Sequence, residues 1–325
     1  MTGNNEPEGV TLQESLANAP KNWGRWGPDD EVGSTNFIDA EAVRSASQTI
    51  VSGQVITLGL PIGDPRGEPI YPGRAQSMRY NTQDRGSYVA GKRTPFPGGL
   101  EYADDIMIMF LQGSTQVDAL AHIWYDETTY NGYSADTTVG GLSRASVLPL
   151  ANRGIVGRAV LVDIARYRNV DALDRGEEFT LDEMLDAARS QDLTIHPHDV
   201  LLVRTGWIPM FYEKGAAEFY RPPFEEPGLL YEPKVAKWFH EQEIVGWGTD
   251  TIGNELSVQP ETLIRGSALH AALMRNLGVI FIEMLWLEEL AKECAADGRY
   301  EFFFVCSPLK IHGATGSPVN PIAIR

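Results

Sequence analysis

The hydrophobic residues of this chain fall into short apolar runs that alternate with amphipathic segments. An apolar run of about four to eight residues between turn formers is typical of a buried strand. Such runs occur at residues 55–60, 106–110, 157–164, 198–204, 245–250, 278–283 and 302–311. A helical spacing of apolar residues occurs at 39–47, 180–189, 234–240, 267–274 and 284–296, and Thr180 with Glu183 forms a capping-box pattern. The mixture predicts a single α/β or α+β domain over residues 1–325, because no composition shift marks a linker.

Two stretches lie outside this pattern. Residues 1–45 form an N-terminal extension that is polar at first and then dense in Gly and turn formers. Residues 63–99 are rich in Pro, Gly, Arg and Tyr and are too long for an ordinary connection, so they predict a functional loop or an arm. We expect this segment to cover the site and to supply Tyr80 or Tyr88 to the substrate. The alternative is a surface loop ordered only by packing.

The charge balance excludes some classes of partner. The chain has 44 acidic and 27 basic residues and a net charge of -17, which argues against nucleic acid or an anionic membrane surface as a partner. The N-terminus lacks the basic and apolar regions of a signal peptide, and no stretch approaches the roughly 18 apolar residues of a membrane span. Cys294 and Cys306 are too few for a disulfide framework and are expected to be core thiols. A cytoplasmic protein is predicted.

The candidate chemistry is concentrated in residues 112–122. This segment follows the apolar run 106–110, which we interpret as a buried strand opening into a turn. Asp118 and His122 are four residues apart, so they would share one face of a helical turn. A carboxylate and an imidazole with this spacing suit metal binding and proton transfer. We expect the charge of Asp118 to raise the affinity of His122 for its proton.

A second group of polar residues occurs in the last third of the chain. Glu283 closes an otherwise apolar strand, where an unpaired carboxylate would cost several kcal/mol. It therefore needs a cation, a hydrogen-bond network or a proton, unless it only caps the next helix. His270 lies in the preceding helical segment, and His312 begins a Gly-rich loop. We expect Asp118, His122, His270 and Glu283 to converge in one pocket.

Residues 112–122 resemble the signature of the cyclase family of metal-dependent hydrolases, which includes bacterial kynurenine formamidase and isatin hydrolase. That signature reads His-x-Gly-Thr-His-x-Asp-x-Pro-x-His. Thr115, Asp118 and His122 match it, whereas Gln112 and Gln116 stand in place of histidines and Leu120 in place of the proline. Residues 22–36 and 312–321 resemble a longer branch of the same family.

The resemblance implies a fold, an assembly and a set of functional residues. The family fold is a swivelling β/β/α type, and its members form homodimers or homotetramers. By resemblance, His270 and Glu283 match a helix histidine and a strand-end glutamate that act as metal ligands or catalytic partners. The implied metal ligands are Gln112, Gln116, Asp118, His270 and Glu283, and the implied catalytic residues are His122, His270 and Glu283.

The two glutamines affect which cofactor is expected. An amide oxygen is a hard ligand, so a divalent ion at this site would be Mn or Mg rather than Zn. The alternative is a site that has given up metal and kept an acid–base set of His122, His270, Asp118 and Glu283.

Three functions compete at the level of sequence. The first is hydrolysis of a small cyclic or acyl amide or of a lactone, and the second is a metal-independent cyclase, dehydratase or isomerase of secondary metabolism. The third is a catalytically inactive small-molecule binder. Aromatic residues near the motifs suggest a flat, aromatic or cyclic substrate; the candidate substrate-binding residues are Tyr80, Trp124, Tyr130, Trp207 and His312.

Overall fold

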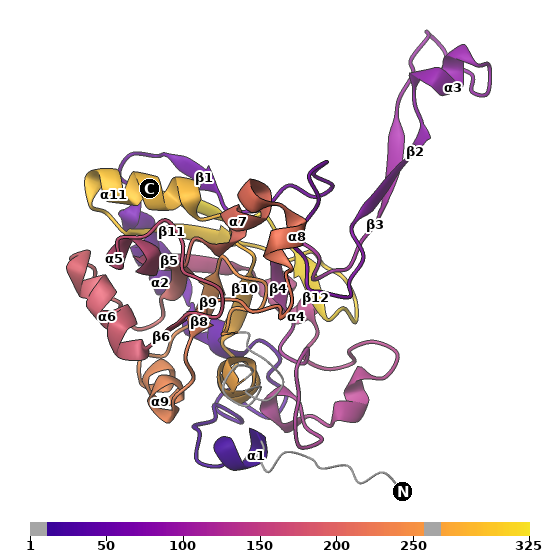
Figure 1. Cartoon of the computed structure of the whole chain (residues 1–325). Helices are drawn as coiled ribbons and strands as arrows, with labels where there is room; N and C mark the ends of the chain where they lie inside the picture. The colour runs from indigo at the N-terminus through magenta and orange to yellow at the C-terminus, as the bar shows by residue number, and fades with distance from the viewer. Residues whose placement is uncertain (1–11, 257–267) are drawn as a thin grey trace, which may run out of the picture.

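A curled nine-stranded sheet forms the centre of the protein (Figure 1). The computed structural model describes residues 12–256 and 268–325. The strand order is β1-β13-β11-β5-β7-β9-β10-β4-β12. These strands are β1 (Val55–Thr57), β4 (Gln116–Asp118), β5 (Ile155–Asp163), β7 (Val200–Arg204), β9 (Gly246–Thr249), β10 (Ile280–Glu283), β11 (Glu301–Cys306), β12 (Gly316–Pro318) and β13 (Ile322–Ile324).

The middle of the sheet is parallel and its flanks are antiparallel. Strands β5, β7, β9 and β10 pair in parallel, whereas β11, β13 and β1 on one side and β4 and β12 on the other pair antiparallel. Every residue of β9 and β10 is buried, as is all of β7 except Arg204. Parallel strands covered on both faces need uninterrupted apolar runs, which is the pattern that predicted them.

Helices surround this sheet, and several begin where the sequence predicts. Thr180 caps α6 by accepting a hydrogen bond from the backbone N–H of Glu183, and Asp39 caps α2 in the same way through Ala42. The predicted helix at 267–274 corresponds to a π-helix, η6 (His270–Arg275), while Ser267 lies outside the described residues. In the part of the chain that the structure describes, the α-helices are α1 (Leu12–Ser15), α2 (Ala40–Ala46), α3 (Arg85–Val89), α4 (Val147–Arg153), α5 (Ile164–Tyr167), α6 (Leu181–Ser190), α7 (Trp207–Lys214), α8 (Ala216–Phe219), α9 (Pro233–Glu241) and α11 (Glu288–Asp297).

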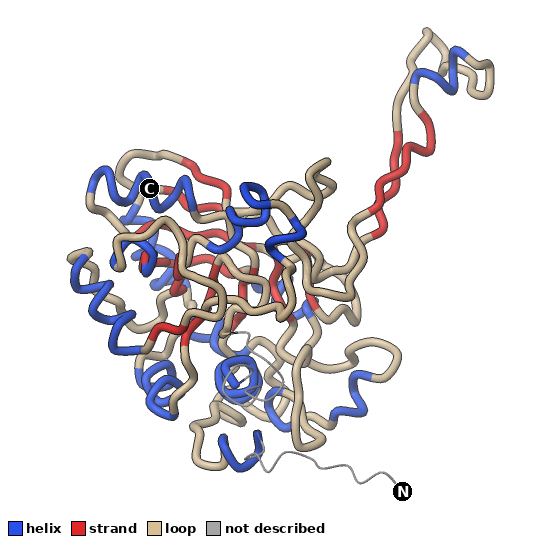
Figure 2. Tube along the Cα trace, in the orientation of Figure 1, coloured by secondary structure: helices blue, strands red, loops and turns tan. Residues whose placement is uncertain are grey.

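A two-stranded arm projects from the body of the molecule (Figure 2). It consists of β2 (Met78–Gln83) paired antiparallel with β3 (Asp104–Ile108), with α3 between them at the tip. The expectation of a buried strand at 106–110 was wrong, since all five residues of β3 are exposed. An apolar run shows that a strand can form, but not whether anything covers its faces. The arm extends beyond the predicted 63–99 segment, because β3 is its return strand.

The buried side chains form two clusters. The larger one lies around the sheet and includes Trp247, Phe281 and Phe304. The smaller one includes Trp207, Phe211, Phe219 and Met284, the last of which directly follows β10. Cys294 and Cys306 are buried free thiols, as predicted. Within residues 12–256 and 268–325, no helix is long and apolar enough to span a membrane.

Candidate active site

The pairing of β4 with β10 joins the two polar groups that the sequence places far apart. Gln116 lies opposite Glu283, and Val117 lies opposite Ile282. Asp118 is two residues from Gln116 and therefore lies on the same face of β4. Ligand atoms of Asp118, His270 and Glu283 all lie within 4.8 Å of one another, and all three residues are buried. The predicted convergence of these residues is confirmed.

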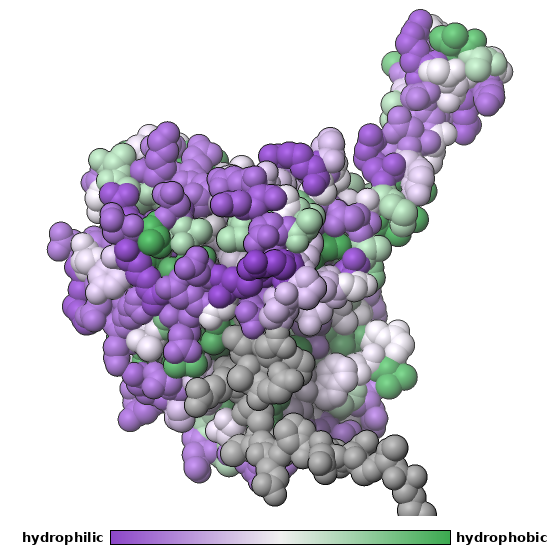
Figure 3. Space-filling view, viewed as in Figure 1, coloured by the Kyte–Doolittle hydropathy of each residue, from purple (hydrophilic) through white to green (hydrophobic). Residues whose placement is uncertain are grey.

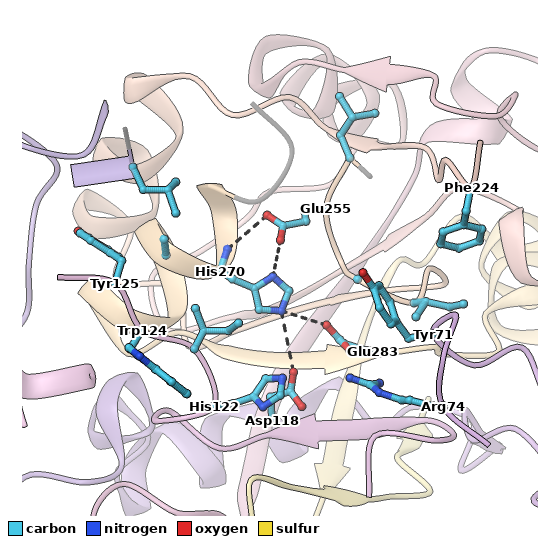
Figure 4. Close-up of a pocket in the computed structure, with 16 residues that line it drawn as sticks. Tyr71, Arg74, Asp118, His122, Trp124, Tyr125, Phe224, Glu255, His270 and Glu283 are labelled. Carbon is cyan, nitrogen blue, oxygen red and sulfur yellow. Dashed lines mark hydrogen bonds and ion pairs between the residues drawn. The ribbon is translucent and has the colours of Figure 1, made fainter. Parts of the chain in front are cut away.

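His270 stands at the centre of this cluster (Figure 4). Its Nε2 atom lies 3.3 Å from Glu283 Oε1 and 3.9 Å from Asp118 Oδ2. Its Nδ1 atom lies 2.6 Å from Glu255 Oε1. His270 is the first residue of η6, and π-helical turns occur frequently at functional sites.

Two adjacent residues, Thr115 and Gln116, position the carboxylate of Glu283 and the turn that follows it. Gln116 Nε2 donates a hydrogen bond to Glu283 Oε2. Met284, the next residue, has a φ of 57°, which turns the chain sharply at the end of β10. Thr115 Oγ1 stabilises this turn by donating to the carbonyl of Met284 at 2.6 Å, and it accepts from the N–H of Leu60 at 2.8 Å. The threonine of the sequence motif thus has a structural task in the site.

Among the described residues, three buried oxygens of this cluster accept no hydrogen bond: Gln116 Oε1, Asp118 Oδ1 and Glu283 Oε1, although Glu283 Oε1 is within ion-pair distance of His270 Nε2. Unsatisfied buried oxygens are costly, and a cation that accepts their lone pairs removes that cost. Gly316 packs closely against this cluster: an added Cβ would lie 2.7 Å from Gln112 Nε2 and 3.2 Å from Asp118 Oδ1, so a larger residue would displace one of these side chains. The oxygens together with His270 Nε2 therefore fit a divalent cation.

Gln112 is placed differently from Gln116. Its Nε2 atom donates to Thr315 Oγ1 at 2.9 Å, and its side chain does not line the pocket that contains the cluster. Neither glutamine lines the cavity, and a Cβ added at Gly316 would lie 2.7 Å from Gln112 Nε2 and 3.2 Å from Asp118 Oδ1. Metal binding by Gln112 therefore stays a prediction.

Burial and crowding of like charges shift the proton affinities in the cluster. Burial, followed by repulsion from Glu283, raises the pKa of Asp118 to about 6. Burial by itself lowers the pKa of His270, but attraction to Glu255 and Glu283 raises that pKa well above its usual value. The pKa of His122 is lowered, because burial outweighs its attraction to Asp118. Asp118 does raise the proton affinity of His122, as expected, but burial has the larger effect and the net shift of the pKa is downward.

A cavity of about 430 Å³ opens onto the cluster. Asp118, His122, His270 and Glu283 all line it, together with Glu255. Asp118 ends a strand and His122 follows in a turn, so the two share a cavity rather than the predicted helical face. Further walls of the cavity are formed by aromatic residues and one arginine, namely Tyr71, Arg74, Trp124, Tyr125 and Phe224 (Figure 4).

Of the five predicted substrate-binding residues, only Trp124 lines this cavity. Tyr80 lies on the arm and is 54% exposed. Tyr130 is fully buried and donates its hydroxyl hydrogen bond to Asp30 at 2.7 Å, while Trp207 belongs to the smaller core cluster. His312 is exposed in a turn and does not line the cavity. An aromatic residue that is close to a motif in sequence can equally well belong to the core, because tertiary packing decides which way its side chain points.

Sequence reasoning missed Glu255 and Arg74. Nothing in the sequence around Glu255 indicates a site, because its partner His270 is fifteen residues further along. Arg74 had a weak signal. It follows Pro72-Gly73, a pair of turn formers inside the segment that was expected to cover the site.

The fold and the site together define an α/β protein with a buried Asp–His–Glu cluster at one edge of a cavity. The Cyclase family model matches residues 47–255 of the chain. A crystal structure described as a novel cyclase aligns with a TM-score of 0.83 and 35% identity, over 94% of this chain and 99% of that one. The chain belongs to the cyclase family, as its sequence motif suggested, and it has that family's fold.

More distant solved structures share the fold at lower identity. An isatin hydrolase bound to the product analogue thioisatinate aligns with a TM-score of 0.59 and 19% identity, covering 88% of this chain and 98% of that chain. Isatin hydrolase A from Labrenzia aggregata, bound to benzyl benzoate, aligns with a TM-score of 0.58 and 19% identity, covering 83% and 93%. A predicted metal-dependent hydrolase from Bacillus stearothermophilus aligns with a TM-score of 0.51 and 19% identity, covering 83% and 97%. Among curated protein sequences, none matches this chain significantly.

Proposed function

We propose that this protein is a hydrolase that opens a small cyclic or acyl amide, or a lactone, with the help of a divalent metal ion. The observation that carries this proposal is the convergence of Asp118, His270 and Glu283 in a cavity that also contains His122, with three buried oxygens that accept no hydrogen bond among the described residues. Structural neighbours described as isatin hydrolases and as a predicted metal-dependent hydrolase agree with it.

The residues that would hold the ion are Asp118, His270 through Nε2, and Glu283, with the amide oxygen of Gln116 nearby. When bound, such an ion lowers the pKa of a water molecule to about 7 and polarises a carbonyl group. Three of these four ligand atoms are oxygens, so we expect Mn or Mg in preference to Zn.

His122 is the residue that we propose transfers the proton. It lines the same cavity as the cluster, and its lowered pKa keeps the imidazole neutral near pH 7, ready to accept a proton. The negative charge of Asp118 then stabilises the imidazolium, which can return the proton to the leaving group. Positioned acid–base catalysis of this kind contributes about 10² to 10⁴ in rate.

Glu255 acts on this chemistry through His270. Its Oε1 atom is paired with His270 Nδ1, and its Oε2 atom accepts from the backbone N–H of Leu269 at 2.9 Å. The carboxylate thereby fixes the direction of the ring and leaves Nε2 facing Asp118 and Glu283. A carboxylate behind a ligating histidine commonly has this orienting role.

A second candidate function is a metal-independent cyclase, dehydratase or isomerase. Its support is that His270, placed between the carboxylates of Glu255 and Glu283, already has two anionic partners without any ion. In that case His122 and His270 would act as an acid–base pair on the same substrate.

The test between the two functions is a metal measurement combined with turnover. We expect protein purified without chelator to contain about one Mn or Mg per chain by elemental analysis, and to lose hydrolysis of aromatic amides and lactones in excess chelator. Undiminished turnover in the chelator, by protein shown to be free of metal, would establish the metal-independent function instead.

Self-association is a further part of the proposal. The arm carries Tyr80 and Ile106 opposite each other on its two strands, 54% and 51% exposed. Figure 3 shows hydrophobic side chains at the tip of the arm and at its base. Exposed apolar surface of this kind marks a contact region, which supports a homodimer or homotetramer.

A further inference from the structure

We propose that Arg74 binds a carboxylate group of the substrate, so that the substrate class is an aromatic or cyclic acid carrying a hydrolysable amide or lactone. The hydrolysable bond rests on the proposed function. The recognition of an acid rests on the position and the contacts of Arg74 itself.

The backbone places Arg74 at the cavity through a tight turn. Residues 71–74 read Tyr-Pro-Gly-Arg, and the N–H of Arg74 donates to the carbonyl of Tyr71 at 3.1 Å. Gly73 has a φ of 96°. Proline followed by a residue with positive φ is the signature of a type II turn, in which glycine is strongly preferred at the third position. This turn therefore fixes the position of the Arg74 backbone at the cavity.

The guanidinium group of Arg74 is oriented but not neutralised. Its Nη1 atom donates to the carbonyl of Gln112 at 2.7 Å, and its Cζ atom lies 5.4 Å from the centre of the Tyr71 ring. A guanidinium has five N–H donors, and only this one is paired in the described part of the chain. No carboxylate among residues 12–256 and 268–325 forms an ion pair with Arg74. Donors that are held in place and left open are suited to a planar anion.

Arg74 also faces the reacting groups. In Figure 4 its guanidinium end points toward Asp118, and Tyr71 lies beside it. The positive charge of Arg74 acts on both Asp118 and His122, and it lowers the pKa of each group. Among the cavity-lining residues that the structure describes, it is the one lysine or arginine. A ligand anchored there would extend over the aromatic walls and present its other end to the cluster.

The walls of the cavity complete the description of the ligand. Tyr71, Trp124, Tyr125 and Phe224 offer flat apolar surfaces around a single fixed cation. The ligand that matches these surfaces has an aromatic or cyclic body and one carboxylate. A different role for Arg74 is to offset the charge of Asp118, Glu255 and Glu283 and nothing more. That role predicts stronger metal binding in a variant that lacks the positive charge, but no change in the preference for acids.

The experiment compares an aromatic acid with its neutral amide. The probes are 3-phenylpropionate and 3-phenylpropionamide, and their affinities are measured by calorimetry or NMR titration on metal-loaded protein. We expect the wild type to favour the acid, and Arg74→Gln to reduce the acid-to-amide ratio about 10- to 100-fold, the range of a lost charge-assisted hydrogen bond. Arg74→Lys keeps the charge but not the planar fork, so its ratio should be intermediate.

Two controls distinguish carboxylate binding by Arg74 from a general effect of charge and from binding of the acid to the metal ion. Arg79→Gln removes the same charge five residues away on the arm, where Arg79 pairs with Asp105, and should leave the ratio unchanged. Chelator-treated protein shows whether the acid binds through the ion, since the proposal requires the dependence on Arg74 to persist there. An unchanged acid-to-amide ratio in folded Arg74→Gln overturns the proposal. Because binding is measured without turnover, a failure of the hydrolase proposal would appear separately, as absence of hydrolysis.

Discussion

Gln116 donates a hydrogen bond to Glu283 across the antiparallel pair of β4 and β10. The residue that replaces a histidine of the family signature is thus used to hold a carboxylate of the cluster. Its other amide atom, Oε1, is buried and has no hydrogen-bond partner within residues 12–256 and 268–325. In the proposed metal site, this arrangement would place an amide oxygen where the family signature has a histidine nitrogen, and we expect it to change which metal the site prefers.

The metal preference can be tested at Gln116. We expect Gln116→His to raise the affinity for Zn relative to Mn, because imidazole nitrogen is a softer ligand than an amide oxygen. Competition for the two ions, followed by elemental analysis, measures the change. Gln112→His is the matched control and should shift the preference less, since the Gln112 side chain is held by a hydrogen bond to Thr315 and not to Glu283. An equal shift in both variants would contradict the placement of Gln112.

Replacement of His122 separates an enzyme from a binding protein. His122→Asn keeps similar size and some hydrogen bonding but cannot titrate near neutrality. We expect this variant to fold and bind ligand while its turnover falls by at least about a hundredfold. His312→Asn, in an exposed turn, should leave turnover unchanged. Near-normal turnover in His122→Asn would remove this residue from the mechanism.

Glu255 should affect metal affinity without touching the metal. Glu255→Gln weakens the partner of His270 Nδ1, so we expect a loss of about 10- to 100-fold in metal affinity, the usual effect of removing a group that orients a ligand. Titration of metal-free protein with Mn measures it. Glu241→Gln, at an exposed helix position paired with Lys237, serves as the control. An unchanged affinity in Glu255→Gln would mean that His270 is oriented without its help.

The buried carboxyl of Glu226 predicts a pH dependence of stability. Burial raises its pKa from the ordinary 4.5 to about 8. Between these two values the folded state binds more protons than the unfolded state, so the free energy of unfolding falls as pH rises through that window. Glu226→Gln cannot titrate, and we expect it to lose less stability than the wild type between about pH 5 and about pH 8.5.

Denaturant unfolding at the two pH values measures the effect of Glu226. Glu289→Gln, at an exposed position of α11, should keep the pH dependence of the wild type. If Glu226→Gln and the wild type lose equal stability over this range, the carboxyl of Glu226 is not held protonated.

The arm predicts the oligomeric state. We expect the wild type to be a dimer or tetramer by light scattering, and the double substitution Tyr80→Asp with Ile106→Asp to weaken association, because charge is costly in an apolar contact. Asn81→Asp changes the opposite face of the same strand and is the control. A monomeric wild type at micromolar concentration would show that the arm has another use.

The sequence determined those features that depend on local chemistry. Apolar runs predicted β5, β7 and β10, and the Thr180 cap predicted the start of α6, because strand burial and helix capping involve residues close in sequence. The cost of burying Glu283 predicted that it needs a partner, and family resemblance pointed to Asp118 and His270.

Only the tertiary structure decided which distant residues meet. Glu255 pairs with His270, and Arg74 lines the cavity, although no sequence motif connects either residue to the site. Likewise, the apolar residues of β3 became exposed on an arm, while Tyr130 and Trp207 were used in the core instead of the site. The sign of the pKa shift of His122 also depended on the fold, since the degree of burial, which outweighs the nearby charge of Asp118, is a property of packing and not of spacing.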